Sequence, residues 1–200
     1  HLWALGEYVQ LARDDDWFKS VADKTAGLCR WVMAQLAKTR KLKSDGQKMR
    51  EYGLMTPGVL AMVDRAVLPL HPRVVVYYCG SNDINADEKP AAIAGHFREF
   101  VERVHQKLPK TKIVYASILR APQKEKAWKE VNETNKLVSD YCKTDPRLTY
   151  VDINGAVFEA NGKPREDLYL EDKLHYKPVT YFGFTSILRP VLFQVWESVK

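Results

Sequence analysis

The sequence predicts an α/β fold in which a parallel sheet of about three strands carries helices on both faces. From residue 56 onward, short runs of β-branched, aliphatic and aromatic residues alternate with helical segments. The three runs cover residues 73–79 (RVVVYYC), 112–118 (KIVYASI) and 148–153 (LTYVDI). Strand–helix alternation with short connections is typical of parallel sheets whose crossover helices cover the sheet faces.

Apolar residues at helical spacing predict one helix before the first strand and one after each strand. The first begins at Thr56, which we expect to cap it with Pro57 at the first helical position. Pro69 and Pro72 then end it near Leu68. The buried faces of the later helices are marked by Ile93, Phe97, Phe100, Val101, Val104 and Leu108 after Pro90, by Trp128, Val131, Val138 and Tyr141, and by Phe182, Ile187, Val191 and Val195 within residues 178–199.

The N-terminal quarter has a different pattern, so we divide the chain into residues 1–55 and a domain of residues 56–200. Helical apolar spacing after three consecutive aspartates predicts a helical extension. Residues 37–50 then hold six basic residues and one acidic residue, which is five of the six net positive charges. Such a stretch is most often a solvated linker, and the alternative is a nucleic-acid or anionic-surface site. Because it lacks interleaved aromatic residues, we expect no nucleic-acid partner.

The composition is that of a soluble globular protein, with 200 residues, 46% of them hydrophobic and 28% charged. No apolar run is long enough to span a bilayer, and the first residues contain no apolar segment of a signal peptide. The chain begins with His1 rather than Met, which indicates a fragment or a processed product. Cys29, Cys79 and Cys142 are too far apart for a metal knuckle or a disulfide framework, so we expect reduced thiols and no metal.

Polar residues follow the first strand, where ligands of open parallel sheets bind. The segment that begins at Gly80 reads Gly-Ser-Asn-Asp. The side-chain amide of Asn82 at a strand end is suited to donate a hydrogen bond to a developing oxyanion. The structural alternative is ordinary turn and cap chemistry, which favours the same residue types.

Asp172 and His175 lie three residues apart just before the last helix. A carboxylate bonded to one imidazole nitrogen fixes the tautomer and leaves the other nitrogen free to accept a proton from a hydroxyl. The alternative is a capping aspartate followed by an exposed histidine.

Together these segments resemble the SGNH/GDSL family of serine ester hydrolases. VVVYYCGSNDI is similar to the family's third block, an apolar strand ending in Gly-x-Asn-Asp, and EDKLHYKPVTYFGF is similar to its last block. The helix with Asn132 and Asn135 falls between them in the family's order, and the resemblance covers about residues 60–197. It implies a three-layer, flavodoxin-like sheet and Ser-His-Asp acyl transfer on acyl, acetyl or carbohydrate esters, without metal or cofactor.

The resemblance also implies residue roles. His175 would be the general base, Asp172 its partner, Asn82 an oxyanion donor and Gly80 the small residue that allows the turn. The family's Gly-Asp-Ser block has no counterpart, so the nucleophile is unknown. Ser81 is adjacent to the site, but its position is variable in the family and its side chain is expected to point away.

Two consequences follow from the missing block. The residues 73–79 strand would form an uncovered hydrophobic edge, so either the N-terminal helices cover it or the domain is incomplete. The resemblance favours a carboxyl-ester hydrolase of this type, which would be inactive if nothing replaces the missing serine. The alternative is a non-catalytic relative that binds a carbohydrate or acyl ligand. Residues 1–60 separately resemble a helical hairpin of the α/α-toroid glycosidases, although a generic helical hairpin explains the same pattern.

Overall fold

The computed structural model describes residues 55–200, which form a three-stranded parallel sheet with helices on both faces. The strands are β1 (Val74–Tyr77), β2 (Lys112–Ala116) and β3 (Leu148–Val151), in the order β1-β2-β3. Both pairings are parallel. The predicted fold class is therefore confirmed, although each strand is shorter than its apolar run.

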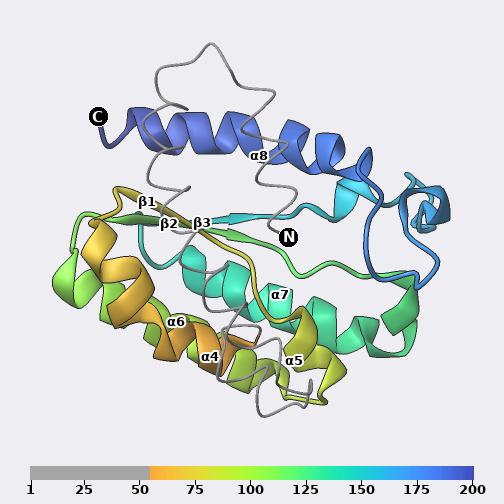
Figure 1. The fold of residues 1–200 in the computed structure, drawn as a ribbon, viewed down its shortest axis with the longest axis horizontal. Coiled ribbons are helices and arrows are strands. Elements are labelled where there is room, and N and C mark those ends of the chain that lie inside the picture. Colours follow the sequence, from red (N-terminus) through yellow and green to blue (C-terminus); the bar gives the residue numbers. More distant parts are fainter. Residues whose placement is uncertain (1–54) are drawn as a thin grey trace, which may run out of the picture. The chain divides into compact units, whose positions relative to one another are not determined.

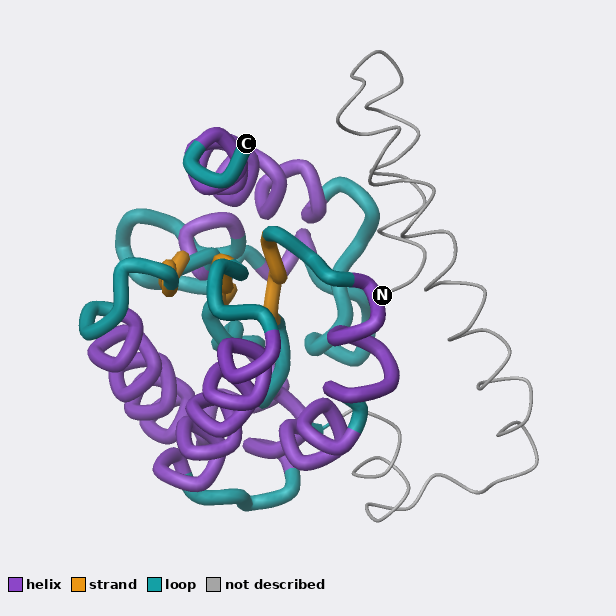
Figure 2. Tube along the Cα trace, turned by 90° about the vertical axis from the view of Figure 1, so that its left-hand side faces the viewer, coloured by secondary structure: helices purple, strands orange, loops and turns teal. Residues whose placement is uncertain are grey.

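Helices α6 (Pro90–Lys107) and α7 (Trp128–Cys142) pack on one face of the sheet, together with α4 (Thr56–Ala61). Helix α8 (Thr180–Glu197) covers the other face, so the strands lie between two helical layers in both views (Figures 1 and 2). Helix α8 begins and ends within two residues of the predicted range, 178–199.

Alternate side chains of β2 point into two different cores, as expected for a strand buried on both faces. Tyr115 lies in the core under α6, where its ring centroid is 4.8 Å from that of Phe97 and 5.4 Å from that of Tyr77. Val114 lies in the opposite core with Phe184 of α8. A central strand with two apolar faces therefore explains why the run lacks polar alternation.

The first helix departs from the prediction at both ends. Met55 is its N-cap, so Thr56 and Pro57 are the first helical residues. The Thr56 hydroxyl donates to the carboxylate of Asp83 instead of capping the helix. After α4 the chain continues as a π-helix and a 3-10 helix. Pro69 lies inside that 3-10 helix rather than ending it, and the turn closes at His71, whose φ of 44° is left-handed. Sequence spacing cannot distinguish these helix types.

Within the described residues β1 pairs only with β2, and side chains at its end are exposed. Val76 is 48% exposed and Tyr78 is 40% exposed. Among residues 55–200, β1 is therefore an edge strand of the sheet.

Cys79 and Cys142 are buried free thiols. No helix among residues 55–200 is long and apolar enough to cross a membrane. The predicted helical extension, the basic linker, the glycosidase-like hairpin and Cys29 lie outside the described residues.

Candidate active site

The turn after β1 requires glycine at position 80. Gly80 has a φ of 121°, and a Cβ atom there would lie 2.5 Å from the Cδ1 atom of Ile118. A side chain would therefore meet both backbone strain and a buried neighbour. The turn-forming part of the Gly80 prediction is explained by this geometry, and its link to an oxyanion site stays a prediction.

Asn82 lies in α5 (Ser81–Asn85), a short helix where the sequence predicted only a turn. The following residue, Asp83, is fully buried and anchors this helix. Its Oδ1 atom accepts hydrogen bonds from the Thr56 backbone amide at 3.0 Å and from the Thr56 hydroxyl at 2.6 Å. The same hydroxyl is 2.9 Å from Nδ1 of His96 in α6. The half-buried Asn82 is thus held on a segment tied to two other helices.

Two buried amides shape the segment after β2. Asn135 of α7 accepts from the Ile118 amide at 2.9 Å and donates to the Ile118 carbonyl at 2.8 Å. Asn154 donates to the same carbonyl at 3.2 Å and accepts from the Arg120 amide at 3.0 Å. These bonds hold Ile118, whose side chain lies against Gly80.

Asp172 and His175 are in contact, as the sequence predicted. Nδ1 of His175 is 2.5 Å from Oδ2 of Asp172, and Oδ1 of Asp172 accepts from the backbone amides of His175 at 2.9 Å and Leu174 at 3.0 Å. The His175 hydrogen bonds, followed by that from Leu174, lower the pKa of Asp172 to about 2. With Nδ1 engaged by a carboxylate, Nε2 is the imidazole atom suited to accept a proton. The His175 side chain is 58% exposed and the Asp172 side chain 50% exposed.

A buried lysine that the sequence analysis missed contacts α5, the helix that follows β1. Lys124 belongs to the 3-10 helix Pro122–Ala127 (η3), and its Nζ atom is 2.6 Å from Oγ of Ser81 and 3.0 Å from the Ser81 carbonyl oxygen. The Ser81 side chain therefore points toward Lys124. Burial lowers the pKa of Lys124 from 10.5 to about 8.

The η3 helix also contacts the loop that carries the Asp172–His175 pair. The Gln123 amide donates to the Lys173 carbonyl at 3.1 Å. One short segment thus touches both α5 and the histidine loop, although the two are about ninety residues apart in sequence.

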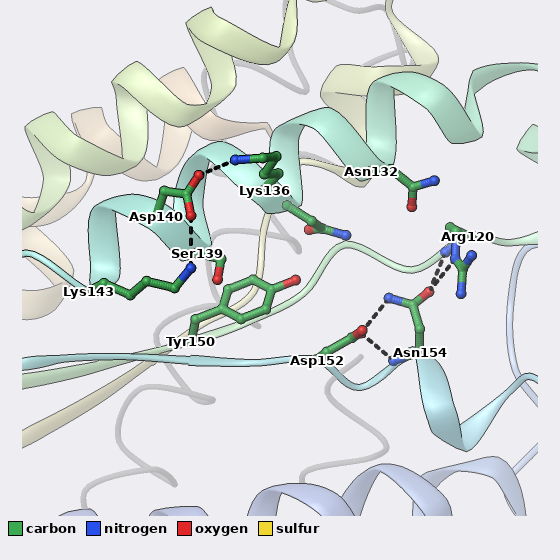
Figure 3. Close-up of a pocket in the computed structure, with 10 residues that line it drawn as sticks. Arg120, Asn132, Lys136, Ser139, Asp140, Lys143, Tyr150, Asp152 and Asn154 are labelled. Atoms are coloured by element: carbon green, nitrogen blue, oxygen red, sulfur yellow. Dashed lines mark hydrogen bonds and ion pairs between the residues drawn. The ribbon is translucent and has the colours of Figure 1, made fainter.

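A polar groove of about 480 Å³ lies beside α7 and the end of β3 (Figure 3). In the figure, hydrogen bonds link Asn154 to Asp152 in the lower part of the view. Above them, Lys136 and Lys143 each bond to the carboxylate of Asp140. The full lining comprises Arg120, Asn132, Asn135, Lys136, Ser139, Asp140, Lys143, Tyr150, Asp152 and Asn154. None of the four predicted site residues lines this groove.

Burial alone would raise the pKa of Asp152, but hydrogen bonds from Asn154 and Ser117 outweigh it and lower that pKa. The Asp152 carboxylate is therefore part of the groove's fixed hydrogen-bond network. Among residues 55–200 no group of three or more His, Cys, Asp or Glu side chains is placed to hold a metal ion.

The fold resembles several solved structures at low sequence identity. A putative acylhydrolase from Bacteroides fragilis superposes with a TM-score of 0.62 at 18% identity, over 74% of this chain and 73% of that one. A carbohydrate esterase family 3 structure from Talaromyces cellulolyticus gives 0.59 at 15% identity, over 70% and 69%. The OSK domain of Drosophila Oskar gives 0.59 at 16% identity, over 70% and 71%. At these identities the likeness establishes the fold alone.

Sequence comparison adds a curated relative and a family. The platelet-activating factor acetylhydrolase IB subunit beta homolog of Drosophila melanogaster is 27% identical over 140 residues, which is 68% of this chain and 59% of the relative. The model of the GDSL-like Lipase/Acylhydrolase family matches residues 14–181. This match begins upstream of residues 60–197, over which the sequence motifs resemble the family. The chain therefore belongs to the GDSL-like lipase/acylhydrolase family.

Proposed function

We propose that this chain is a carboxyl-ester hydrolase that acts on acyl or acetyl esters, with His175 as general base and Asp172 as its orienting partner. The observation that carries the proposal is the 2.5 Å contact between the two side chains, with Asp172 fixed by two further backbone hydrogen bonds. Asp172 favours the tautomer in which Nε2 is unprotonated, and it stabilises the imidazolium once a proton is taken. Asn82 would donate to the oxyanion beyond the turn at Gly80.

The substrate class follows from the family and from one structural neighbour. Members of the family are acylhydrolases, and a carbohydrate esterase shares the fold. A small-molecule or carbohydrate ester is therefore the substrate that we propose. The reaction as written for these residues uses no metal or cofactor.

The test is hydrolysis of an aryl acetate by the full chain. We expect His175→Ala to lower kcat/KM by about 10²–10⁴-fold, because a positioned base contributes about that much. Asp172→Asn should lower it too, because the amide cannot hold the same tautomer. His71→Asn is the matched control, since His71 is an exposed histidine before β1 and asparagine tolerates its left-handed backbone.

Unchanged turnover in His175→Ala would contradict the assignment of the base. A wild-type chain that is folded and has no turnover would contradict the hydrolase proposal itself.

A second candidate is a non-catalytic relative that binds a polar ligand such as a carbohydrate. The groove of Figure 3 favours it, because amide, hydroxyl and charged side chains line it. Titration with oligosaccharides, using Asn132→Ala as the groove variant, tests this reading. Saturable binding that Asn132→Ala weakens, without ester turnover, would support it over hydrolysis.

A further inference from the structure

The buried contact between Lys124 and Ser81 is not explained by the residue roles above. Lys124 is only 4% exposed, yet its Nζ atom is 2.6 Å from the Ser81 hydroxyl oxygen. A lysine this buried is normally paired with a carboxylate. In the part of the chain that the structure describes, Lys124 forms no ion pair; its polar partners there are the hydroxyl and carbonyl oxygens of Ser81.

The carboxylates of the neighbouring elements do not compensate this charge. Helices α5 and α7 pack against η3. Asp83 of α5 is occupied by Thr56, and Glu130 in the first turn of α7 makes no ion pair with Lys124. Burial is the sole cause of the lowered pKa of Lys124, about 8, so a sizeable fraction of the amine is neutral near that pH.

A purely structural role accounts for only part of this geometry. The bond from Nζ to the Ser81 carbonyl would by itself tie η3 to α5. The shorter bond to Oγ places an amine of lowered pKa on a hydroxyl at the carboxyl end of β1, where ligands of parallel sheets bind. Ser81 is half-buried, whereas Lys124 is enclosed, so the base is the more shielded member of the pair.

We propose that Ser81 is the nucleophile of this chain and that Lys124 accepts its hydroxyl proton, while His175 acts as the general base toward the water of the second step. The proposal rests on the ester-hydrolase function above and supplies the nucleophile that the sequence left unknown. Hydrogen bonding to a desolvated lysine is one established way to activate a serine hydroxyl.

The chemistry balances with Ser81, Lys124, His175 and water. Neutral Lys124 Nζ accepts the Ser81 hydroxyl proton while Oγ forms a bond to the ester carbonyl carbon. The tetrahedral intermediate collapses, the bond to the alkoxy oxygen breaks, and the Lys124 ammonium returns the proton to the leaving alcohol. Water then attacks the acyl-serine while Nε2 of His175 accepts its proton. The bond between the acyl carbon and Oγ breaks, the imidazolium gives the proton to Oγ, and the acid and free Ser81 are released.

The test is labelling of the full chain with a fluorophosphonate probe, followed by peptide mapping. We expect an adduct on Ser81 that is absent in Ser81→Ala and forms about 10²-fold or more slowly in Lys124→Met. Labelling should rise as the pH increases through about 8, because the neutral amine is the base. Ser186→Ala and Lys126→Met are matched controls at exposed positions and should label like the wild type.

An adduct on another serine, or no adduct on the folded chain, would overturn the proposal. Ser81 labelling at the wild-type rate in a folded Lys124→Met would overturn the role of Lys124. Mapping of the wild-type adduct needs no substitution, so it decides the nucleophile even where a variant fails to fold.

Parallel assays with an aryl acetate separate this proposal from the function on which it rests. Turnover that depends on His175, without a Ser81 adduct, would refute the Ser81 assignment and leave the hydrolase function standing. A Lys124-dependent Ser81 adduct without turnover would support the Ser81 and Lys124 assignments and contradict the hydrolase function.

Discussion

Replacement of Lys124 by methionine should change how the stability of the fold depends on pH. Lys124 is buried without a carboxylate partner among residues 55–200, and burial lowers its pKa from 10.5 to about 8. Methionine has a similar length and no charge, so the variant removes the titrating group while largely keeping its volume. We expect Lys124→Met to be stabilised relative to the wild type at low pH.

The sign follows from the direction of the shift. Between pH 8 and 10.5 the unfolded chain holds a proton on Lys124 that the folded chain has released, so wild-type stability from this group rises with pH. Below pH 8 both states are protonated and the full destabilisation is present. A difference of about 2.5 pKa units corresponds to about 3 kcal/mol at about 1.4 kcal/mol per unit.

The measurement is urea unfolding of both proteins at intervals from pH 7 to 11. The buried thiol of Cys79 acts in the opposite direction, because burial raises its pKa to about 12 and its stabilisation is lost as the pH rises above about 9. Such groups are common to both proteins and cancel in the difference. The advantage of Lys124→Met should therefore shrink by about 3 kcal/mol over this range. A difference that stays constant within about 1 kcal/mol would refute the reasoning.

Three further substitutions test the geometry of the site. Gly80→Ala should lower the free energy of unfolding by about 1–3 kcal/mol, measured by urea unfolding, because its Cβ would lie 2.5 Å from Ile118 at a φ of 121°. Asn135→Ala should cost about 1–3 kcal/mol in the same assay, since the buried Ile118 amide loses its acceptor. Asp172→Asn should flatten the loss of thermal stability between about pH 4 and 2: the lowered pKa of Asp172 gives stability above its ordinary value of 3.8 that is lost as the pH falls to about 2. Equal acid sensitivity of the Asp172→Asn variant and the wild type would argue that the contact with His175 is weak in solution.

Local patterns predicted the fold well because burial on both faces leaves a clear trace in sequence. The β2 run could be identified because Ile113 and Val114 enter different cores and neither position tolerates a polar residue. The contact of Asp172 with His175 was predictable from local sequence as well, because three residues of separation place the two side chains in one turn. Helix types after Ala61 were not predictable, because π- and 3-10 helices share the apolar spacing of a short α-helix.

The lysine contact shows where local reasoning ends. Lys124 and Ser81 are 43 residues apart, and a lysine next to Gln123 and Glu125 has the sequence appearance of a solvated surface. Its burial follows the tertiary packing of η3 against α5 and α7. The expectation that the Ser81 side chain points away from the site was made without that packing; in the structure its hydroxyl contacts Lys124.

The Asp83 carboxylate has a consequence for how the molecule opens. It joins Thr56, at the start of α4, to α5, and the Thr56 hydroxyl extends the connection to His96 in α6. Loss of these bonds would leave the amide and hydroxyl of Thr56 and the buried carboxylate of Asp83 unpaired, so the start of α4 and α5 should open together. Native-state hydrogen exchange should then report similar opening free energies for the amides of Thr56 and Ile84. The segment that carries Ser81 and Asn82 would be released only in a subglobal unfolding event, not by fraying of a five-residue helix.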